Sequence, residues 1–217
     1  MDKHEIVRRI FNTGVIAVVR LSEASQLAKV ADAIRAGGVD IIEFTMTTPG
    51  ALHIIEESAA RFGEDVVLGA GTVLDAETAR AAILAGAQFV VSPITDFSSI
   101  ELCLRYGKVV IPGTLTPTEI LHAWQAGADF VKVFPASVMG PRYLKDVLAP
   151  LPQVKLVPTG GVGVNNAGEF IRNGAAAIAV GGELVNNKLV SQGKFDTLTE
   201  TARALTEAVH SARACSV

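Results

Sequence analysis

The chain has 217 residues, of which 49% are hydrophobic and 20 are glycine, so it can bury one large core. Its net charge is −3 and its basic residues form no run, which gives no electrostatic support to a nucleic-acid partner. No apolar run reaches the roughly 18 residues that a membrane helix needs, so no membrane partner is expected.

The cysteine content and the N-terminal residues predict the cellular location of the protein. The only two cysteines, Cys103 and Cys215, have the spacing of neither a metal site nor a redox motif. Such cysteine use is typical of a reducing cytoplasm. The segment from Met1 to Arg9 is charged and lacks the apolar centre of a signal peptide. We therefore expect a soluble, cytoplasmic protein.

Short apolar segments rich in β-branched residues alternate along the chain with segments of helical periodicity. A short additional helix is expected first, around residues 3–11. Near-continuous apolar strands are typical of parallel sheets that are covered on both faces. In chain order, the predicted strands are residues 15–20, 39–44, 66–70, 88–92, 108–111, 129–134, 154–157 and 177–180.

The segments between these strands have sequence features that are typical of helices. Leu27, Val30 and Ile34 recur at helical spacing and share one face. Residues 116–119 read Thr-Pro-Thr-Glu, a helix start with proline at the first helical position and a capping-box glutamate. A last helix is expected to pack on the strands through an apolar stripe formed by Phe195, Leu198, Ala202, Leu205 and Val209.

Four predicted helices end at a glycine, namely Gly37, Gly86, Gly127 and Gly174, where a left-handed conformation stops a helix. The intervals between these glycines each fit two strand–helix units, which supports eight units. We therefore expect an α/β fold, a (β/α)₈ TIM barrel with residues 1–217 as a single domain and the additional N-terminal helix ahead of it. An open doubly wound sheet is the alternative, but it usually has fewer strands.

Lys132 lies in the middle of the sixth predicted strand, between apolar neighbours. An isolated ammonium is costly there, and burial lowers the pKa of a lysine. A neutral amine is what nucleophilic attack on a carbonyl requires. From spacing alone, a lysine paired with a carboxylate for structural reasons, or one that reaches the rim, stays open.

Glu43 is likewise a charged residue within an apolar strand. It lies at the end of the second predicted strand, where alternation places it on one face with Ile41. Barrel enzymes build their active sites at the carboxyl ends of the strands. Glu43 could shuttle protons there or serve as a counter-charge to Lys132. Arg20, which closes the first strand, and Thr72, after the third, are expected at the same face. Each could equally be a rim residue with a local hydrogen bond.

Two glycine pairs predict a phosphate site. Thr159-Gly160-Gly161 follows the seventh predicted strand and Gly181-Gly182 follows the eighth. Barrels frequently bind phosphate with these two loops and a helix N-terminus. Glycine lets backbone N–H groups approach the oxygens. Each pair alone could be a tight turn, but their joint position favours phosphate.

No metal and no cofactor are expected. His4, His53, His122 and His210 are scattered without metal-ligand spacing. Residues 160–163 read Gly-Gly-Val-Gly, which is not a dinucleotide fingerprint because the third glycine is missing and the first strand does not precede it.

Together these residues resemble the family of 2-keto-3-deoxy-6-phosphogluconate / 4-hydroxy-2-oxoglutarate aldolases, which are class I, Schiff-base enzymes. The resemblance covers essentially the whole chain, and its most specific pieces are Glu43-Phe44-Thr45, residues 69–74, Lys132-Val133-Phe134-Pro135 and residues 158–162. It implies Lys132 as the Schiff-base lysine, Glu43 as the proton-transfer residue and Thr72 as a pyruvate contact. It also implies a metal-independent homotrimer whose two glycine pairs bind phosphate.

The chain departs from the better-known family pattern at one place. Well-known members carry an arginine four residues after the catalytic glutamate to grip the substrate carboxylate, and this chain has Thr47 there. Relatives without it, including those similar to phosphogalactonate aldolases, have an arginine at the end of the first strand, which matches Arg20. We therefore assign the carboxylate contact to Arg20, and the gluconate or galactonate configuration stays open.

The activity implied by the resemblance is cleavage of 2-keto-3-deoxy-6-phosphogluconate to pyruvate and glyceraldehyde 3-phosphate, and also of 4-hydroxy-2-oxoglutarate to pyruvate and glyoxylate. A 2-keto-3-deoxy-6-phosphogalactonate aldolase is the nearest alternative. A barrel isomerase or epimerase of phosphosugars, with Glu43 as base, need not form an imine. A non-catalytic subunit that binds phosphometabolites would release no pyruvate.

Overall fold

The computed structural model describes residues 1–20 and 26–214, so Cys215 lies outside the described residues. All eight predicted strands are present in that part of the chain, and an additional short strand, which was not predicted, follows the fifth after Pro112. The strands are β1 (Val15–Val19), β2 (Ile41–Thr45), β3 (Val67–Gly71), β4 (Phe89–Val91), β5 (Val109–Ile111), β6 (Gly113–Thr114), β7 (Val131–Val133), β8 (Leu156–Pro158) and β9 (Ile178–Val180).

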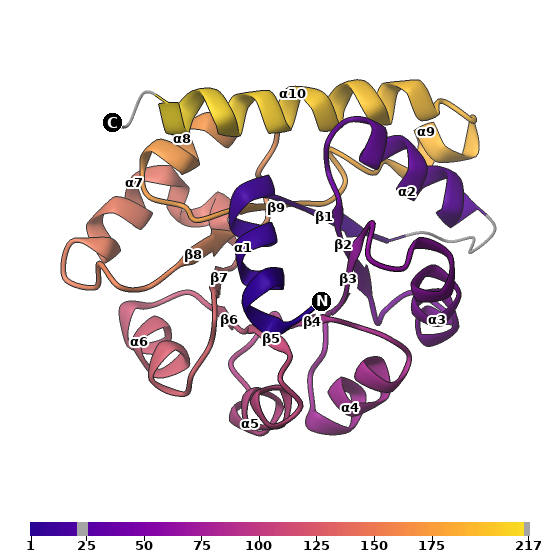
Figure 1. Cartoon of the computed structure of the whole chain (residues 1–217). Coiled ribbons are helices and arrows are strands. Elements are labelled where there is room, and N and C mark those ends of the chain that lie inside the picture. The colour runs from indigo at the N-terminus through magenta and orange to yellow at the C-terminus, as the bar shows by residue number, and fades with distance from the viewer. Residues whose placement is uncertain (21–25, 215–217) are drawn as a thin grey trace.

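Helices connect the strands and surround them (Figure 1). They are α1 (Lys3–Thr13), α2 (Leu27–Ala36), α3 (Ala51–Phe62), α4 (Ala76–Leu84), α5 (Phe97–Arg105), α6 (Pro117–Gln125), α7 (Ala136–Leu148), α8 (Ala167–Arg172), α9 (Asn187–Ser191) and α10 (Phe195–Ala214). The predicted capping box at the start of α6 is confirmed, with Pro117 in its first turn. None of the described helices is long and apolar enough to span a membrane.

The strands form one curled parallel sheet of the TIM-barrel kind. Six strands pair in the order β5-β4-β3-β2-β1-β9, and three in the order β6-β7-β8. Backbone hydrogen bonds join the two groups at both seams. The N–H of Lys132 donates to the carbonyl of Pro112 at 2.8 Å, and that of Ala176 donates to the carbonyl of Leu156 at 2.9 Å. The carboxyl ends of all strands therefore meet at one mouth.

Side-chain alternation divides the core into two layers. Ile41, Phe130 and Val157 lie in a cluster inside the ring of strands, and Ile42 and Val131, one residue further along, lie in the cluster between the strands and the outer helices. The predicted faces of the second strand are thus confirmed. Residues two positions beyond the inner cluster, such as Glu43 and Lys132, follow on the same inward face towards the mouth.

The opposite end of the ring is covered by α1, which lies across the centre of the strands in Figure 1. Its buried Ile6 and Ile10 belong to the inner cluster. Nε of Arg9 forms an ion pair of 2.6 Å with Asp40, which directly precedes β2. Because α1 occupies the amino ends of the strands, a ligand can reach the inner face only from the mouth.

The long helix α10 packs against α2 and α8 through the predicted apolar stripe, in which Leu198, Ala202, Leu205 and Val209 are buried and Phe195 is partly buried. One glycine was assigned wrongly. The left-handed residue after α2 is Gly38, with φ 93°, and not Gly37, with φ −87°. Gly37 serves the packing of α10 instead, because a Cβ there would lie 2.5 Å from Cβ of Ala202.

Candidate active site

Lys132 lies in the middle of β7, in register with Gly113 on one side and Val157 on the other. Only 6% of the residue is exposed, and Nζ lies 5.0 Å from the centroid of the Phe134 ring. Burial lowers the pKa of the Lys132 amine; the charge of Arg20 lowers it further, and the charge of Glu43 opposes the shift. A buried amine with a lowered pKa supplies more of the neutral form that attacks carbonyl carbon.

Glu43 lies on the inner face of β2 and is 1% exposed. Its Oε2 is buried and has no hydrogen-bond partner among the described residues. Burial raises the pKa of this carboxyl, while the positive charges of Lys132 and Arg20 oppose the rise. A buried polar atom without a partner is costly, so its position indicates a role in binding or proton transfer.

Gly71, at the end of β3, makes the room that Glu43 occupies. A Cβ on Gly71 would overlap Oε1 of Glu43 and lie 2.6 Å from its Cγ. Any larger residue at this position would therefore displace the carboxylate. The sequence motif contained Gly71, but we gave it no role, because the approach of a glutamate from a neighbouring strand is visible only in three dimensions.

Lys132 and Glu43 influence each other's charge without forming an ion pair. The ion pairs of the described residues all lie elsewhere, for example between Lys3 and Asp129 at 3.0 Å. Lys132 is therefore not held in an ion pair with a carboxylate, which was the structural alternative to a catalytic role. The arrangement suits a nucleophilic amine and a separate carboxyl group that transfers protons.

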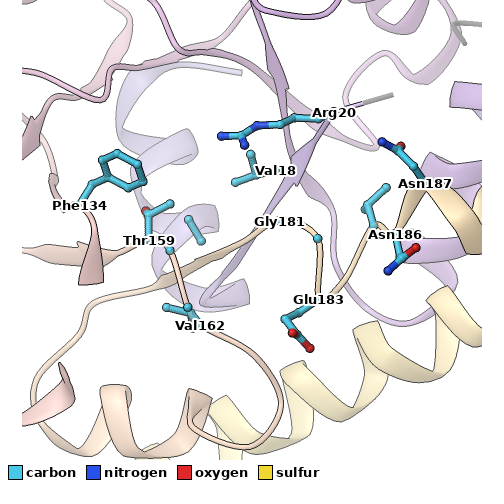
Figure 2. Close-up of a pocket in the computed structure, with 14 residues that line it drawn as sticks. Val18, Arg20, Phe134, Thr159, Val162, Gly181, Glu183, Asn186 and Asn187 are labelled. Atoms are coloured by element: carbon cyan, nitrogen blue, oxygen red, sulfur yellow. The ribbon is translucent and has the colours of Figure 1, made fainter. Parts of the chain in front are cut away.

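A cavity of about 390 Å³ opens at the mouth. The size falls in the range of small-molecule sites. Neither Lys132 nor Glu43 lines the cavity, but Phe134, whose ring centroid lies 5.0 Å from Nζ of Lys132, does. Arg20 lines it together with Val18 and Phe134, and Figure 2 shows the guanidinium directed towards the side of Phe134 and Thr159. Within the described residues, no ion pair or hydrogen bond engages this guanidinium. Arg20 is thus placed to bind an anionic group next to Lys132.

Both glycine pairs line the same cavity, as expected from their positions after β8 and β9. Gly160 and Gly161 have φ angles of 90° and 72°, which a side chain would strain. Thr159 pairs with Ala179 of β9, and the N–H of Gly161 has no acceptor within the described chain. Oγ1 of Thr159 is likewise buried without a partner, and this residue is 8% exposed. The loop therefore offers unused donors to a ligand oxygen.

Thr72 lies apart from that cavity. It lines a separate pocket between the loops after β2 and β3, together with Thr47. Its φ of 56° is unusual for a β-branched residue, and such strain costs about 1–3 kcal/mol and clusters at functional sites. Thr47 donates to Oγ1 of Thr45 at 3.2 Å and offers no charge to a substrate. The role of Thr72 stays a prediction.

Sequence reasoning missed further residues that line the cavity. Phe134 lies two positions after Lys132, so alternation alone could have placed it on the same face. Glu183 directly follows the second glycine pair, and Asn186 and Asn187 precede or begin α9. Figure 2 shows these three polar side chains on the far side of the cavity from Phe134.

A TIM-barrel-like fold with a buried amine, a buried carboxyl and an open cavity at the carboxyl ends of the strands is typical of barrel enzymes, which build their active sites at this mouth. Comparison with known proteins gives the particular family. The family described as KDPG and KHG aldolase matches residues 6–201. The chain therefore belongs to this aldolase family, and it is a metal-independent Schiff-base lyase.

Individual relatives agree with this assignment. The chain is 37% identical over 189 residues to the 2-dehydro-3-deoxy-phosphogluconate aldolase of Treponema pallidum, covering 85% of this chain and 88% of that protein. It is 34% identical over 172 residues to the 2-dehydro-3-deoxy-6-phosphogalactonate aldolase of Escherichia coli, covering 78% of this chain and 83% of the relative.

A solved structure adds chemical detail about a relative. The KDPG aldolase of Legionella pneumophila, with pyruvate captured as a covalent carbinolamine intermediate, superimposes with a TM-score of 0.86 at 28% identity. That comparison covers 92% of this chain and 97% of the relative. A carbinolamine is the adduct that precedes an imine, so the relative's chemistry is that of a Schiff-base enzyme.

Proposed function

We propose that this aldolase cleaves 2-keto-3-deoxy-6-phosphogluconate to pyruvate and glyceraldehyde 3-phosphate, and 4-hydroxy-2-oxoglutarate to pyruvate and glyoxylate. The observation that carries the proposal is the buried Lys132 amine, which has a lowered pKa and no ion pair among the described residues. It lies 5.0 Å from the centroid of the Phe134 ring, which lines the same cavity as Arg20. The relatives named for phosphogluconate support the first substrate.

In the proposed reaction, the Lys132 amine attacks the 2-keto carbon, and loss of water gives a protonated imine. Glu43, directly or through a water molecule, accepts the proton of the C4 hydroxyl. The C3–C4 bond then breaks, its electron pair moves into the imine, and an aldehyde leaves. The resulting enamine is protonated at C3, and hydrolysis of the imine releases pyruvate and the free amine.

Three groups hold the substrate in this proposal. Arg20 binds the carboxylate next to the imine, because its planar guanidinium can donate two parallel hydrogen bonds. Oγ1 of Thr159 and the loops of both glycine pairs bind the terminal phosphate of the substrate. Thr72 is assigned to the pyruvate part, although its pocket opens on the β2–β3 side.

The galactonate isomer is the second candidate. Thr47 replaces the arginine of the better-known pattern, and the phosphogalactonate aldolase of Escherichia coli is among the similar relatives. Arg20 follows β1, whereas the arginine of the better-known pattern follows β2. Arg20 would therefore bind the substrate carboxylate from a different side. Turnover of the gluconate, the galactonate and hydroxyoxoglutarate substrates, measured as pyruvate release, distinguishes them. A chain that releases pyruvate from none of the three contradicts the proposal.

A homotrimer is proposed for the assembly. Exposed apolar side chains gather in the segments that follow β4 and β7, including Ile94, Phe97 and Val138, which are 49%, 55% and 70% exposed. Exposed apolar groups of this kind mark contacts between proteins. One similar solved structure is a cage built by fusing symmetric oligomeric domains. Light scattering coupled to gel filtration tests the trimer, and a monomeric mass contradicts it.

A location in the cytoplasm is also proposed, as the sparse cysteines predict. Cys103 is buried, and burial raises the pKa of its thiol to about 12, so this group is inert to oxidation as a thiolate. Fractionation of cells that express the chain tests this location.

A further inference from the structure

The active-site cavity carries a carboxylate beside the glycine loops that are expected to bind phosphate. Among the described residues that line the cavity, Arg20 is the one cation and Glu183 is the one carboxylate. They lie at opposite ends, and the carboxylate of Glu183 is directed away from the guanidinium (Figure 2). A substrate held by Lys132 and Arg20 would therefore extend its tail towards Glu183.

Glu183 is well placed to meet that tail. It follows Gly181 and Gly182, and its side chain lies along the loop after β8, where a Cβ on Gly163 would be 3.2 Å from Cγ of Glu183. Glu183 lines the cavity and is exposed to solvent, and its carboxylate has no ion pair and no hydrogen-bond partner among the described residues. Its charge is therefore not neutralised by another side chain of that part of the protein.

Neighbouring side chains offer hydrogen bonds rather than positive charge. Oδ1 of Asn186 accepts from the N–H of Lys188 at 2.9 Å, which leaves its amide N–H groups free to donate. Asn187 lines the same wall. Amide and carboxylate groups together match the donors and acceptors of sugar hydroxyls.

We propose that Glu183 is a specificity-determining residue that lowers the preference of the site for a terminal phosphate and accepts hydrogen bonds from an uncharged, hydroxyl-terminated tail. The substrate class then includes 2-keto-3-deoxy sugar acids without a phosphate. The proposal rests on the proposed aldolase function. At low ionic strength, a phosphate dianion roughly 6 Å from a carboxylate is repelled enough to weaken binding about tenfold, and added salt screens this repulsion.

The test compares 2-keto-3-deoxy-6-phosphogluconate with 2-keto-3-deoxygluconate in the wild type, Glu183→Gln and Glu183→Ser. We expect both variants to raise the ratio of kcat/KM values, phosphorylated over unphosphorylated, by about tenfold. Inorganic phosphate should inhibit both variants at about tenfold lower concentration. Glu207→Gln on α10 removes the same charge from an exposed position outside the cavity and should leave the ratio unchanged.

An unchanged ratio in Glu183→Gln, or an equal change in Glu207→Gln, overturns the proposal. Trapping of pyruvate on Lys132 by borohydride separates this failure from that of the aldolase function itself. If trapping is intact but the ratio does not move, only the role of Glu183 is wrong. If the wild type traps no pyruvate and cleaves neither substrate, the aldolase function is wrong.

Discussion

Replacement of Gly71 by alanine tests whether the position of Glu43, and not merely its presence, supports turnover. The added Cβ would overlap Oε1 of Glu43, so the carboxylate must rotate away from its place on β2. The backbone of Gly71 does not have a positive φ, and alanine can therefore adopt it. Extra atoms in a packed interior cost about 1–3 kcal/mol of stability.

The loss of turnover in Gly71→Ala should be larger than its loss of folding stability alone would explain. A positioned acid–base group contributes about 10²–10⁴-fold to a rate, which corresponds to roughly 3–5 kcal/mol of activation free energy. We expect Gly71→Ala to lose a factor in this range, as a displaced Glu43 would. The assay is pyruvate release coupled to lactate dehydrogenase, with the midpoint of thermal unfolding measured in parallel.

Two controls distinguish displacement from general damage. Gly168→Ala on α8 places its Cβ 3.2 Å from the flexible end of Arg172 and should keep wild-type turnover. In the double variant Glu43→Ala with Gly71→Ala, the overlapping side chain is gone, so stability should match Glu43→Ala alone. Turnover within twofold of wild type in Gly71→Ala refutes the reasoning, as does a double variant less stable than Glu43→Ala.

Three further predictions concern the charged groups of the site. Glu43→Gln should keep the fold and slow turnover by about 10²–10⁴-fold, and a rate near wild type would reduce Glu43 to a counter-charge. Arg20→Lys should raise the pyruvate concentration needed for imine trapping and Arg20→Ala should raise it further, with little change in inhibition by phosphate. The opposite pattern would make Arg20 a phosphate ligand. Because burial lowers the pKa of Lys132, the rate of pyruvate trapping should rise with pH and level off below 10.5. Glu43→Gln removes a charge that raises this pKa and should move the rise to lower pH, whereas a midpoint at or above 10.5 in the wild type contradicts the assignment.

Much of this site was predictable because parallel strands obey simple rules. A charged residue within a strand that is buried on both faces needs a reason, and this rule drew attention to Lys132 and Glu43 before the family resemblance gave them roles. Period-two alternation put Glu43 on the inner face with Ile41, as the structure confirms. The glycine pairs were found because the loops after the last two strands of a barrel share one mouth.

Other features depend on contacts that no local pattern records. Gly37 was taken for a helix end, but its small size serves the approach of α10 from the far end of the chain. Asp129 was included in a strand, but it precedes β7, and its carboxylate accepts from the N–H of Val110 at 3.1 Å. The separate pocket of Thr72 arises from how two loops pack, which spacing does not specify.

The central claim is that Lys132 forms an imine with pyruvate. Incubation of the protein with pyruvate and borohydride, followed by peptide mass spectrometry, tests it most directly. We predict one reduced pyruvate-derived adduct, on the peptide that contains Lys132, and none in Lys132→Ala. An adduct on another peptide, or labelling undiminished in Lys132→Ala, would contradict the mechanism.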